Sequence, residues 1–372
     1  MFETTQFHIA GAGVAGLATA NALAQRRAPV SVYDPAPAIT EVGAGLQISP
    51  NGFAVMDALG LGDALRDRSL ESRAVVLRNQ AGREVLRMDL AQHAHGVFLL
   101  AHRAALIDVL YEGIKGLGVD LHLNKAVDTP LSVPDDQLWI AADGVRSKTR
   151  AKMNRDGNPF FTGQVAWRAL IEGDGPPEAE VFMGPGCHLV SYPLRGGLRN
   201  IVAVQERSAW AEDSWNARDD PDNLRAAFKG FGGPVQDWLA QVKTVQIWGL
   251  FRREVARVWH KNRTALVGDA AHPTLPFLAQ GANLALEDAW VLTQCLADHE
   301  TAAAAFESYQ FKRHDRAIRV IKAANNNARN YHIRNKGLQA IAHSGLRVGS
   351  RLFPQAALKK YAWIYGHDVT RS

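Results

Sequence analysis

The feature that most constrains the fold lies near the start of the chain, in the stretch HIAGAGVAGLATANALAQRRAPVSVYD at residues 8–34. An apolar run typical of a strand leads into Gly11, Gly13 and Gly16, and an Ala-rich helix follows. In such a unit the first glycine makes a tight turn. The second lets a phosphate approach the backbone, and the third lets helix and strand pack closely. The stretch therefore predicts a βαβ unit that binds a dinucleotide.

The same unit supplies further contacts to a nucleotide. Val14 and Ala15 begin the helix, whose free N–H groups face the phosphates. Asp34 ends the second strand, where a carboxylate binds an adenosine ribose. This unit alone leaves three interpretations open: an NAD enzyme, an FAD enzyme, or a nucleotide-shaped core without chemistry.

The organisation of the chain predicts two joined domains, because 372 residues exceed the usual size of one hydrophobic core. Residues 160–261 are rich in alternating strands, whereas strands and helices mix on either side of them. The pattern of a buried parallel strand returns at 263–273, and the chain is almost wholly helical from Ala282 to about Ser350. We therefore predict an α/β fold with a Rossmann-like cofactor domain, an inserted β-sheet-rich substrate domain and a helical C-terminal region.

The predicted boundaries follow from these changes of pattern. They are 1–72, 97–160 and 262–345 for the discontinuous cofactor domain, 73–96 and 161–261 for the substrate domain, and 346–372 for a C-terminal segment packed on the body. Local signals add a Gly-rich loop before a helix that starts near Asn51, a hairpin turn at 79–82 and a helix from His102 to Gly116.

Charge and cysteine content exclude several classes of protein. The formal charge of +5 is spread along the chain, which gives little support for nucleic-acid binding. It is compatible with attraction of anionic cofactors and a small anionic substrate, and equally with a merely basic surface. Cys187 and Cys295 are too few for a disulfide framework and lack metal-ligand spacing, so we expect no metal.

Targeting signals are also absent from the pattern of the sequence. The early strand and its glycines argue against a signal peptide, and no apolar run approaches the length of a membrane span. We expect a cytoplasmic protein, and a homodimer is compatible with the sequence.

A second motif, TALVGDAAHPTLPFLAQGANLALEDAWVL at residues 264–292, favours FAD over NAD. Gly268 permits close approach of the backbone, and Asp269 can accept hydrogen bonds from a polyol such as the ribityl chain of a flavin. The helix that begins near Gly281 presents free N–H groups, which suit the negative charge of a reduced flavin ring. FAD is long enough to span both motifs.

With these residues in view, the chain resembles the group A flavoprotein monooxygenases of the p-hydroxybenzoate hydroxylase fold. It is most similar to the branch that contains salicylate hydroxylase, 3-hydroxybenzoate 6-hydroxylase and 6-hydroxynicotinate 3-monooxygenase. Three motifs match in order and extend over most of the chain: GAGVAG at 11–16, ADGVRSKTR at 142–150 and GDAAHPTLPFLAQGANLALEDA at 268–289. They are specific for the family and weak for the substrate.

The resemblance implies a role for each matched position. It implies tightly bound, non-covalent FAD, with the first glycines and Asp34 at the ADP part and Asp269 at the ribityl chain. Arg103 and Gln47 are implied on the flavin side, and Asp143 with Gly144 lies between the phosphates and the path of transient NAD(P)H. The residues implied around the isoalloxazine are Pro276, Gln280, Gly281, Ala282 and Asn283.

The resemblance also implies the reaction. NAD(P)H reduces the flavin, O2 gives a C4a-hydroperoxide, and its distal oxygen hydroxylates an electron-rich ring while water is excluded. A phenolic substrate reacts better when it is ionised, so a base or proton relay is useful at neutral pH. His188 and Tyr192 lie four apart on a predicted strand and share one face. We expect them, with Pro276 and Gln280, to form the catalytic group.

Other positions qualify the choice of substrate. Gln47 and Phe277 stand where the hydroxynicotinate-type enzymes have His, and Ser191 stands where some benzoate hydroxylases have it, so we expect a different substrate. Arg168 is a candidate for steering a carboxylate, although an Arg on a sheet more often forms a structural ion pair. His272 is predicted to orient its loop rather than act as a base. Two tryptophans are predicted to lie in the core or an interface: Trp210 and Trp215.

The sequence therefore predicts an FAD- and NAD(P)H-dependent monooxygenase that hydroxylates a small, anionic aromatic or N-heteroaromatic compound. Two alternatives stay open. One is a flavin-dependent reductase or dehydrogenase on the same fold, and the other is a non-catalytic dinucleotide-binding redox sensor.

Overall fold

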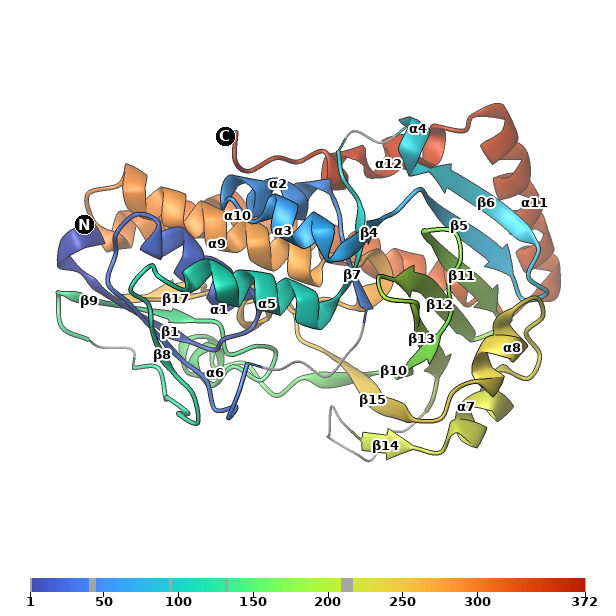
Figure 1. Cartoon of the computed structure of the whole chain (residues 1–372), viewed down its shortest axis with the longest axis horizontal. Helices are drawn as coiled ribbons and strands as arrows, with labels where there is room; N and C mark the ends of the chain where they lie inside the picture. The colour runs from blue at the N-terminus through green and yellow to red at the C-terminus, as the bar shows by residue number, and fades with distance from the viewer. Residues whose placement is uncertain (1, 40–44, 94–95, 131–132, 209–216, 372) are drawn as a thin grey trace.

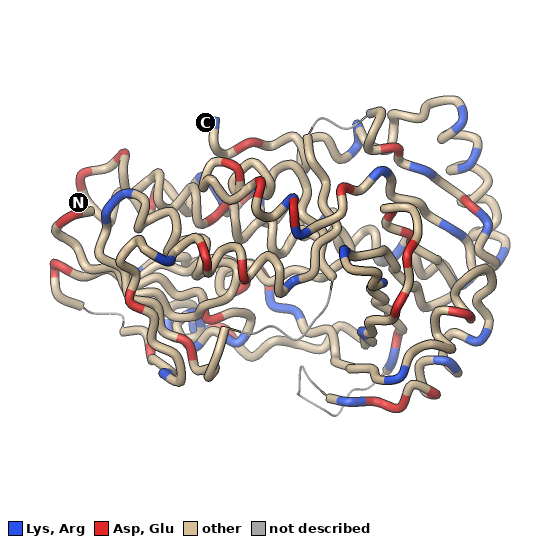
Figure 2. The backbone as a smooth tube through the Cα atoms, viewed as in Figure 1, with Lys and Arg blue, Asp and Glu red and all other residues tan. Residues whose placement is uncertain are grey.

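The computed structural model describes residues 2–39, 45–93, 96–130, 133–208 and 217–371 (Figure 1). Trp210 and Trp215 lie outside the described residues. Two large sheets stand at opposite ends of the molecule, and long helices cover the first and bridge toward the second (Figure 1). No helix in the described ranges is both long and apolar enough to cross a membrane. Residues of both charge signs are interspersed over both ends of the molecule (Figure 2).

The first sheet has the order β16-β17-β9-β1-β2-β8, and all its neighbours are parallel except β16 and β17. Its strands are β1 (Gln6–Ala10), β2 (Val30–Tyr33), β8 (Asp120–His122), β9 (Gln137–Ala141), β16 (His260–Lys261) and β17 (Thr264–Leu266). The parallel strands place their carboxyl ends at one edge, where open α/β sheets bind ligands. The strand at 264–266 lies far along the sequence, yet it extends the sheet that the N-terminal βαβ unit begins.

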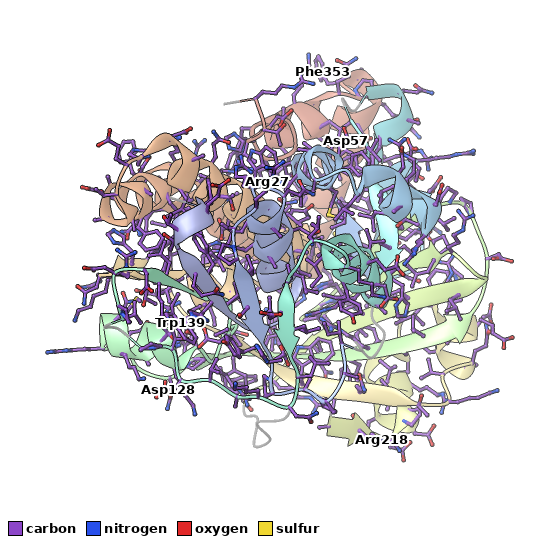
Figure 3. All side chains as sticks on the ribbon, turned by 60° about the vertical axis from the view of Figure 1, so that its left-hand side comes forward. Arg27, Asp57, Asp128, Trp139, Arg218 and Phe353 are labelled. Atoms are coloured by element: carbon purple, nitrogen blue, oxygen red, sulfur yellow. The ribbon has the colours of Figure 1, made fainter. Side chains whose placement is uncertain are left out.

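Helices bury one face of this sheet. Phe7, Ile9 and Ile140 point toward α1 and pack with Leu17 in a core whose members are fully buried. The opposite face carries aromatic rings. Trp139, which is labelled in Figure 3, stacks on His8 with 4.6 Å between the ring centroids. The helices of this half are α1 (Val14–Ala24), α2 (Pro50–Ala58), α3 (Gly62–Asp67), α5 (Arg103–Ile114), α6 (Lys148–Asn154), α9 (Gly281–Asp298) and α10 (Ala302–Tyr331).

The second sheet has the order β14-β15-β10-β13-β12-β11-β5-β6. Its strands are β5 (Ala74–Asn79), β6 (Glu84–Asp89), β10 (Phe160–Glu172), β11 (Glu178–Gly184), β12 (Cys187–Leu194), β13 (Leu198–Glu206), β14 (Ala217–Asp219) and β15 (Val245–Arg252). The hairpin predicted at 79–82 joins β5 to β6, and β5 pairs in parallel with β11. Two segments far apart in the sequence thus share one sheet. This sharing supports the domain boundaries given above, which we keep as a proposal.

One face of the second sheet is covered by α7 (Pro221–Phe228) and α8 (Val235–Ala240). Trp167, Phe182 and Phe228 are fully buried between this face of the sheet and the two helices. The other face looks toward the first half of the molecule and toward α11 (Lys336–Leu352) and α12 (Ala356–Tyr365), and α4 (Leu90–His93) follows β6. The predicted C-terminal helical region is confirmed.

A third, small sheet differs from the sequence prediction. It has the order β3-β7-β4, with β3 (Gly45–Ile48), β4 (Ser69–Glu71) and β7 (Leu99–His102). The prediction of a Gly-rich loop up to the helix at Pro50 was wrong for 45–48, because this segment pairs antiparallel with β7. That pairing places residues 45–48 between the two halves of the molecule.

Candidate active site

A cavity of about 680 Å³ lies between the two halves of the molecule. The first turns of α1 and α9 border it on one side, and β10, β12, β13 and β15 border it on the other. It continues between the second sheet and α10 to α12. The predicted site residues among its lining are Gly13, Val14, Ala15, Gln47, Arg103, Gly144, Arg168, His188, Tyr192, Asp269, Pro276, Phe277, Gly281 and Ala282. Six others lie outside the lining: Gly11, Gly16, Asp34, Asp143, Gln280 and Asn283.

The glycines of the first motif shape the α1 end of the cavity. A Cβ on Gly11, whose φ is +107°, would lie 2.4 Å from the carbonyl oxygen of Ala142. A Cβ on Gly16 would lie 1.8 Å from the carbonyl oxygen of Gly11. Around Gly13, by contrast, nothing lies within 4 Å of the Cβ position, and this residue lines the cavity. Among the described residues no side chain caps α1, so its first N–H groups are open to an anion.

Asp34 holds the shape of this turn. Its two carboxylate oxygens accept hydrogen bonds from the backbone N–H of Ala12 at 2.7 Å and of Ala36 at 2.8 Å. The carboxylate therefore lies at the end of β2 beside the glycine turn. Each oxygen retains acceptor capacity. Ribose binding by Asp34 stays a prediction.

Asp269 is part of the cavity wall. Its side chain is accessible from the lumen although protein surrounds it, and no described residue donates a hydrogen bond to it. This enclosure raises the pKa of Asp269, while His272 and Arg103 oppose the rise. A Cβ on Gly268, whose φ is +59°, would lie 2.8 Å from Cβ of Ala15. The arrangement packs the second motif against the first and presents an acceptor for a polyol between them.

The N-terminus of α9 forms the next part of the wall. Gly281 and Ala282 line the cavity, and the described residues supply no side-chain cap for this helix. Pro276 and Phe277 form part of a 3₁₀ turn just before it. Two open helix N-termini thus face one cavity. Together with the carboxylate of Asp269, to which no residue of the described ranges donates a hydrogen bond, they fit a long ligand that carries a pyrophosphate, a polyol and a ring that becomes anionic.

Gln280 and Asn283 turn away from the cavity. The Gln280 amide nitrogen donates to Ser49 Oγ at 2.8 Å, and Asn51 Nδ2 donates to Gln280 Oε1 at 3.0 Å. Asn283 Nδ2 donates to the carbonyl of Gln47 at 3.1 Å. These side chains therefore fasten the start of α9 to β3 and α2. Gln280 and Asn283 can border a ligand only through their backbone.

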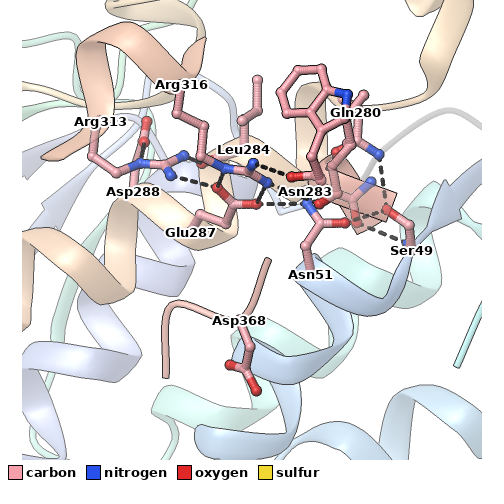
Figure 4. Close-up of polar contacts among 12 residues, drawn as sticks. Ser49, Asn51, Gln280, Asn283, Leu284, Glu287, Asp288, Arg313, Arg316 and Asp368 are labelled. Atoms are coloured by element: carbon pink, nitrogen blue, oxygen red, sulfur yellow. Dashed lines mark hydrogen bonds and ion pairs between the residues drawn. The ribbon is translucent and has the colours of Figure 1, made fainter. Parts of the chain in front are cut away.

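A buried charge network lies behind this helix start (Figure 4). Glu287 accepts hydrogen bonds from Asn51 Nδ2 at 2.6 Å, Arg313 Nη1 at 2.5 Å, and Arg316 Nε and Nη2 at 2.7 and 2.6 Å. Asp288 accepts from Arg313 Nε at 2.8 Å. Both carboxylates are fully buried. The sequence prediction missed this network, although the paired acids of α9 and the arginines three apart in α10 are its visible signal.

Asp288 also supports the second motif. It accepts a hydrogen bond from the backbone N–H of Gly268 at 2.9 Å and pairs with His272 Nε2. Burial alone would raise the pKa of Asp288, but its contacts with His272 and Arg313 lower it to about 2. His272 is buried, with its ring next to Trp259. This placement agrees with an orienting role for His272, since it ties the loop to α9.

The substrate side of the cavity lies on β12. His188 and Tyr192 are both buried and line the cavity from the same face of this strand. The His188 ring lies 5.4 Å from the ring of Phe277 and 5.3 Å from that of Tyr331. Tyr331, at the end of α10, is a lining residue that the sequence prediction missed, because the chain reaches this wall only after a 30-residue helix.

Burial shifts the pKa values of His188 and Tyr192 in opposite directions. It lowers the pKa of His188 well below its usual value and raises the pKa of Tyr192. At neutral pH the imidazole is therefore a neutral acceptor and the phenol keeps its proton. Arg168 lies on β10, which β13 separates from β12, and its guanidinium carbon is 4.1 Å from the centroid of the Trp248 ring. It adds a positive charge to the same wall.

Asp143 and Gly144 follow β9 at the edge of the cavity. Burial raises the pKa of Asp143, and a hydrogen bond with Ser147 opposes the rise. Gly144 has a φ of +74° and lines the cavity. The turn thus lies beside the glycine turn of the first motif, and its role in the path of NAD(P)H stays a prediction.

Comparison with known proteins shows which family and which relatives the chain is similar to. The family model described as FAD binding domain matches residues 4–324. The chain is 31% identical to a 3-hydroxybenzoate 6-hydroxylase of Polaromonas naphthalenivorans (strain CJ2), over 97% of this chain and 96% of that protein. It is also 31% identical to a 6-hydroxynicotinate 3-monooxygenase of Bordetella bronchiseptica, over 86% of this chain and 90% of that one.

A solved structure agrees in fold. The crystal structure of Klebsiella pneumoniae HpxO complexed with FAD and uric acid superposes with a TM-score of 0.82 and 26% identity, over 95% of each chain. The similarity extends over nearly the whole molecule, including the second sheet. The predicted fold class and the predicted family resemblance are confirmed.

Proposed function

The chain belongs to the FAD binding domain family and is a flavoprotein monooxygenase, and from this premise we propose its reaction. We propose that it uses NAD(P)H and O2 to hydroxylate a small, anionic aromatic or N-heteroaromatic compound. One observation carries the proposal: a single cavity joins the two open helix N-termini and Asp269 to a buried wall that holds His188 and Tyr192.

The residues of the first half fit FAD. The uncapped start of α1 with Gly13 would hold the pyrophosphate, and Asp269 would accept hydrogen bonds from the ribityl hydroxyls. The start of α9 at Gly281 would face the flavin ring. When bound, FAD supplies hydride acceptance from NAD(P)H and, with O2, an electrophilic oxygen atom.

The residues of the second half fit an acidic aromatic ring. Neutral His188 is placed to accept the proton of a ring hydroxyl, and protonated Tyr192 is placed to donate a hydrogen bond. Arg168 supplies positive charge for an anionic substituent. The apolar side chains around them exclude water, which would otherwise divert oxidising equivalents into hydrogen peroxide.

The relatives guide the choice of test compounds. We propose a panel of 3-hydroxybenzoate, salicylate, 6-hydroxynicotinate, 3-amino-4-hydroxybenzoate and urate, with NADH and NADPH as reductants. In anaerobic stopped-flow experiments, a substrate should accelerate bleaching of the FAD absorbance. In air the same compound should be hydroxylated. Acceleration by none of them and oxygenation of none would contradict the proposal, whereas reduction without oxygenation would favour the reductase alternative.

A further inference from the structure

A chain of three side chains leads from the cavity wall to the surface. Nδ1 of His188 lies 2.6 Å from Nε2 of His332, and Nδ1 of His332 lies 3.0 Å from Oε1 of Glu206. Both rings are buried, whereas 31% of the Glu206 side chain is exposed to solvent. Resting on the proposed function, we propose that these three residues carry the proton of the substrate hydroxyl from the cavity to water.

The carboxylate at the outer end sets the direction of every hydrogen bond. An ionised carboxylate only accepts, so Nδ1 of His332 donates to Glu206. A neutral imidazole has one N–H, which leaves Nε2 of His332 as the acceptor. Nδ1 of His188 must then donate to it. The remaining atom, Nε2 of His188, has a free lone pair and no partner among the described residues. It is the atom left for a molecule in the cavity.

The transfer balances at each step. The substrate O–H bond breaks, its electron pair stays on oxygen as phenolate, and the proton binds Nε2 of His188. The proton on Nδ1 of His188 moves to Nε2 of His332. The proton on Nδ1 of His332 moves to Glu206, which releases it to water. Nothing is oxidised or reduced, and the reverse transfer later in the cycle restores both tautomers.

The surroundings of the three residues favour neutral imidazoles and an ionised carboxylate between transfers. Burial lowers the pKa of both His188 and His332, with Glu206 opposing the effect at His332, so neither ring retains a second proton at neutral pH. For Glu206, burial acts to raise the pKa, but Arg334 and His332 lower it. The carboxylate is therefore ionised at rest, as the tautomer argument requires.

Neighbouring groups do not compete for the proton. Cys187 lies next to His188 on β12, and burial raises the pKa of its thiol to about 11. Burial likewise raises the pKa of Tyr331, whose ring packs on His188. Arg334 is a charged neighbour of the carboxylate, and its Nε lies 3.1 Å from Glu206 Oε2. It holds the carboxylate in place and stays cationic.

The tautomers can be read without any substrate. In ¹⁵N NMR of the FAD-loaded protein labelled on histidine, both His188 and His332 should carry the proton on Nδ1. Glu206→Gln keeps the shape of the side chain but allows its amide to donate, so a second population with the proton on Nε2 should emerge. A wild-type His188 protonated on Nε2 would overturn the proposal.

Kinetics test the function of the chain. In single turnover of the reduced protein with O2 and 3-hydroxybenzoate, Glu206→Gln and His332→Asn should slow hydroxylation by about tenfold to a hundredfold near pH 7. The loss should shrink as pH rises, because hydroxide then ionises the phenol. FAD binding should not change. Glu112→Gln is the matched control, since it removes an exposed carboxylate that pairs with Arg68.

The outcomes separate two failures. If the wild-type protein hydroxylates 3-hydroxybenzoate or another member of the panel, and both variants match its rate and pH profile, the relay is wrong while the proposed function stands. If the wild-type protein hydroxylates no member of the panel, the proposed function is wrong, and the relay that rests on it falls as well. The NMR result then describes only the hydrogen-bond direction.

Discussion

Removing the charge of Glu287 should strongly destabilise the protein. The carboxylate is fully buried and accepts four hydrogen bonds, two at each oxygen, from Asn51, Arg313 and Arg316. In Glu287→Gln, whichever oxygen becomes the amide nitrogen faces two donors. Two charge-assisted bonds are lost, and two buried guanidinium groups keep less negative charge between them. From about 1.5–3 kcal/mol per bond we expect a loss of about 3–6 kcal/mol.

Urea unfolding of the FAD-loaded protein, followed by tryptophan fluorescence, measures this loss. The control is Glu112→Gln, which breaks one half-exposed contact of 2.7 Å with Arg68 and should cost at most about 1 kcal/mol. Asn51→Ala removes one hydrogen bond to Glu287 and one to Gln280 and leaves the ion pairs, so a cost of about 2–4 kcal/mol keeps the test informative if the first variant does not fold. A Glu287→Gln protein within about 1 kcal/mol of wild type would refute the reasoning.

Three further predictions follow from the same geometry. Asp269→Ala should weaken FAD binding by about tenfold to a hundredfold, because it removes charge-assisted hydrogen bonds worth about 1.5–3 kcal/mol, and an unchanged Kd by flavin fluorescence would contradict its placement. Gly16→Ala should abolish FAD binding, since its Cβ would lie 1.8 Å from the Gly11 oxygen; flavin retained on gel filtration would argue against that packing. Asp288, whose pKa falls from 3.8 to about 2 on folding, should contribute about 2 kcal/mol that is complete above pH 4 and is lost as pH falls toward 2. In urea titrations at successive pH values, Asp288→Asn should reduce this fall of the unfolding free energy at acid pH. An equally steep fall in the variant would mean that another group causes it.

The first sheet and its ligand edge could be predicted because their physics is local. Gly11 needs a positive φ, and neither Gly11 nor Gly16 leaves space for a side chain, so the sequence records the turn directly. The spacing of His188 and Tyr192 on a strand likewise placed them on one face. These patterns depend on neighbours within a few residues.

The remainder depends on contacts between distant segments. The β3 segment pairs with β7, which lies more than 50 residues further along the chain, and the Gly-rich pattern of β3 does not indicate that partner. Gln280 was expected at the flavin, but its amide binds Ser49 and Asn51 because α2 packs beside α9. His332 meets His188 only because a 30-residue helix ends beside β12. The periodicity of residues along the chain does not predict such contacts between distant segments.

In the proposed reaction, one cavity brings an oxygen atom of O2, activated by bound FAD, to an aromatic ring. Its most direct test is turnover of the panel compound that accelerates FAD reduction, under ¹⁸O2, with mass spectrometry of the product. The proposal predicts one ¹⁸O atom in each molecule of hydroxylated product. Unlabelled product, or consumption of NAD(P)H that yields only hydrogen peroxide with every compound, would contradict it.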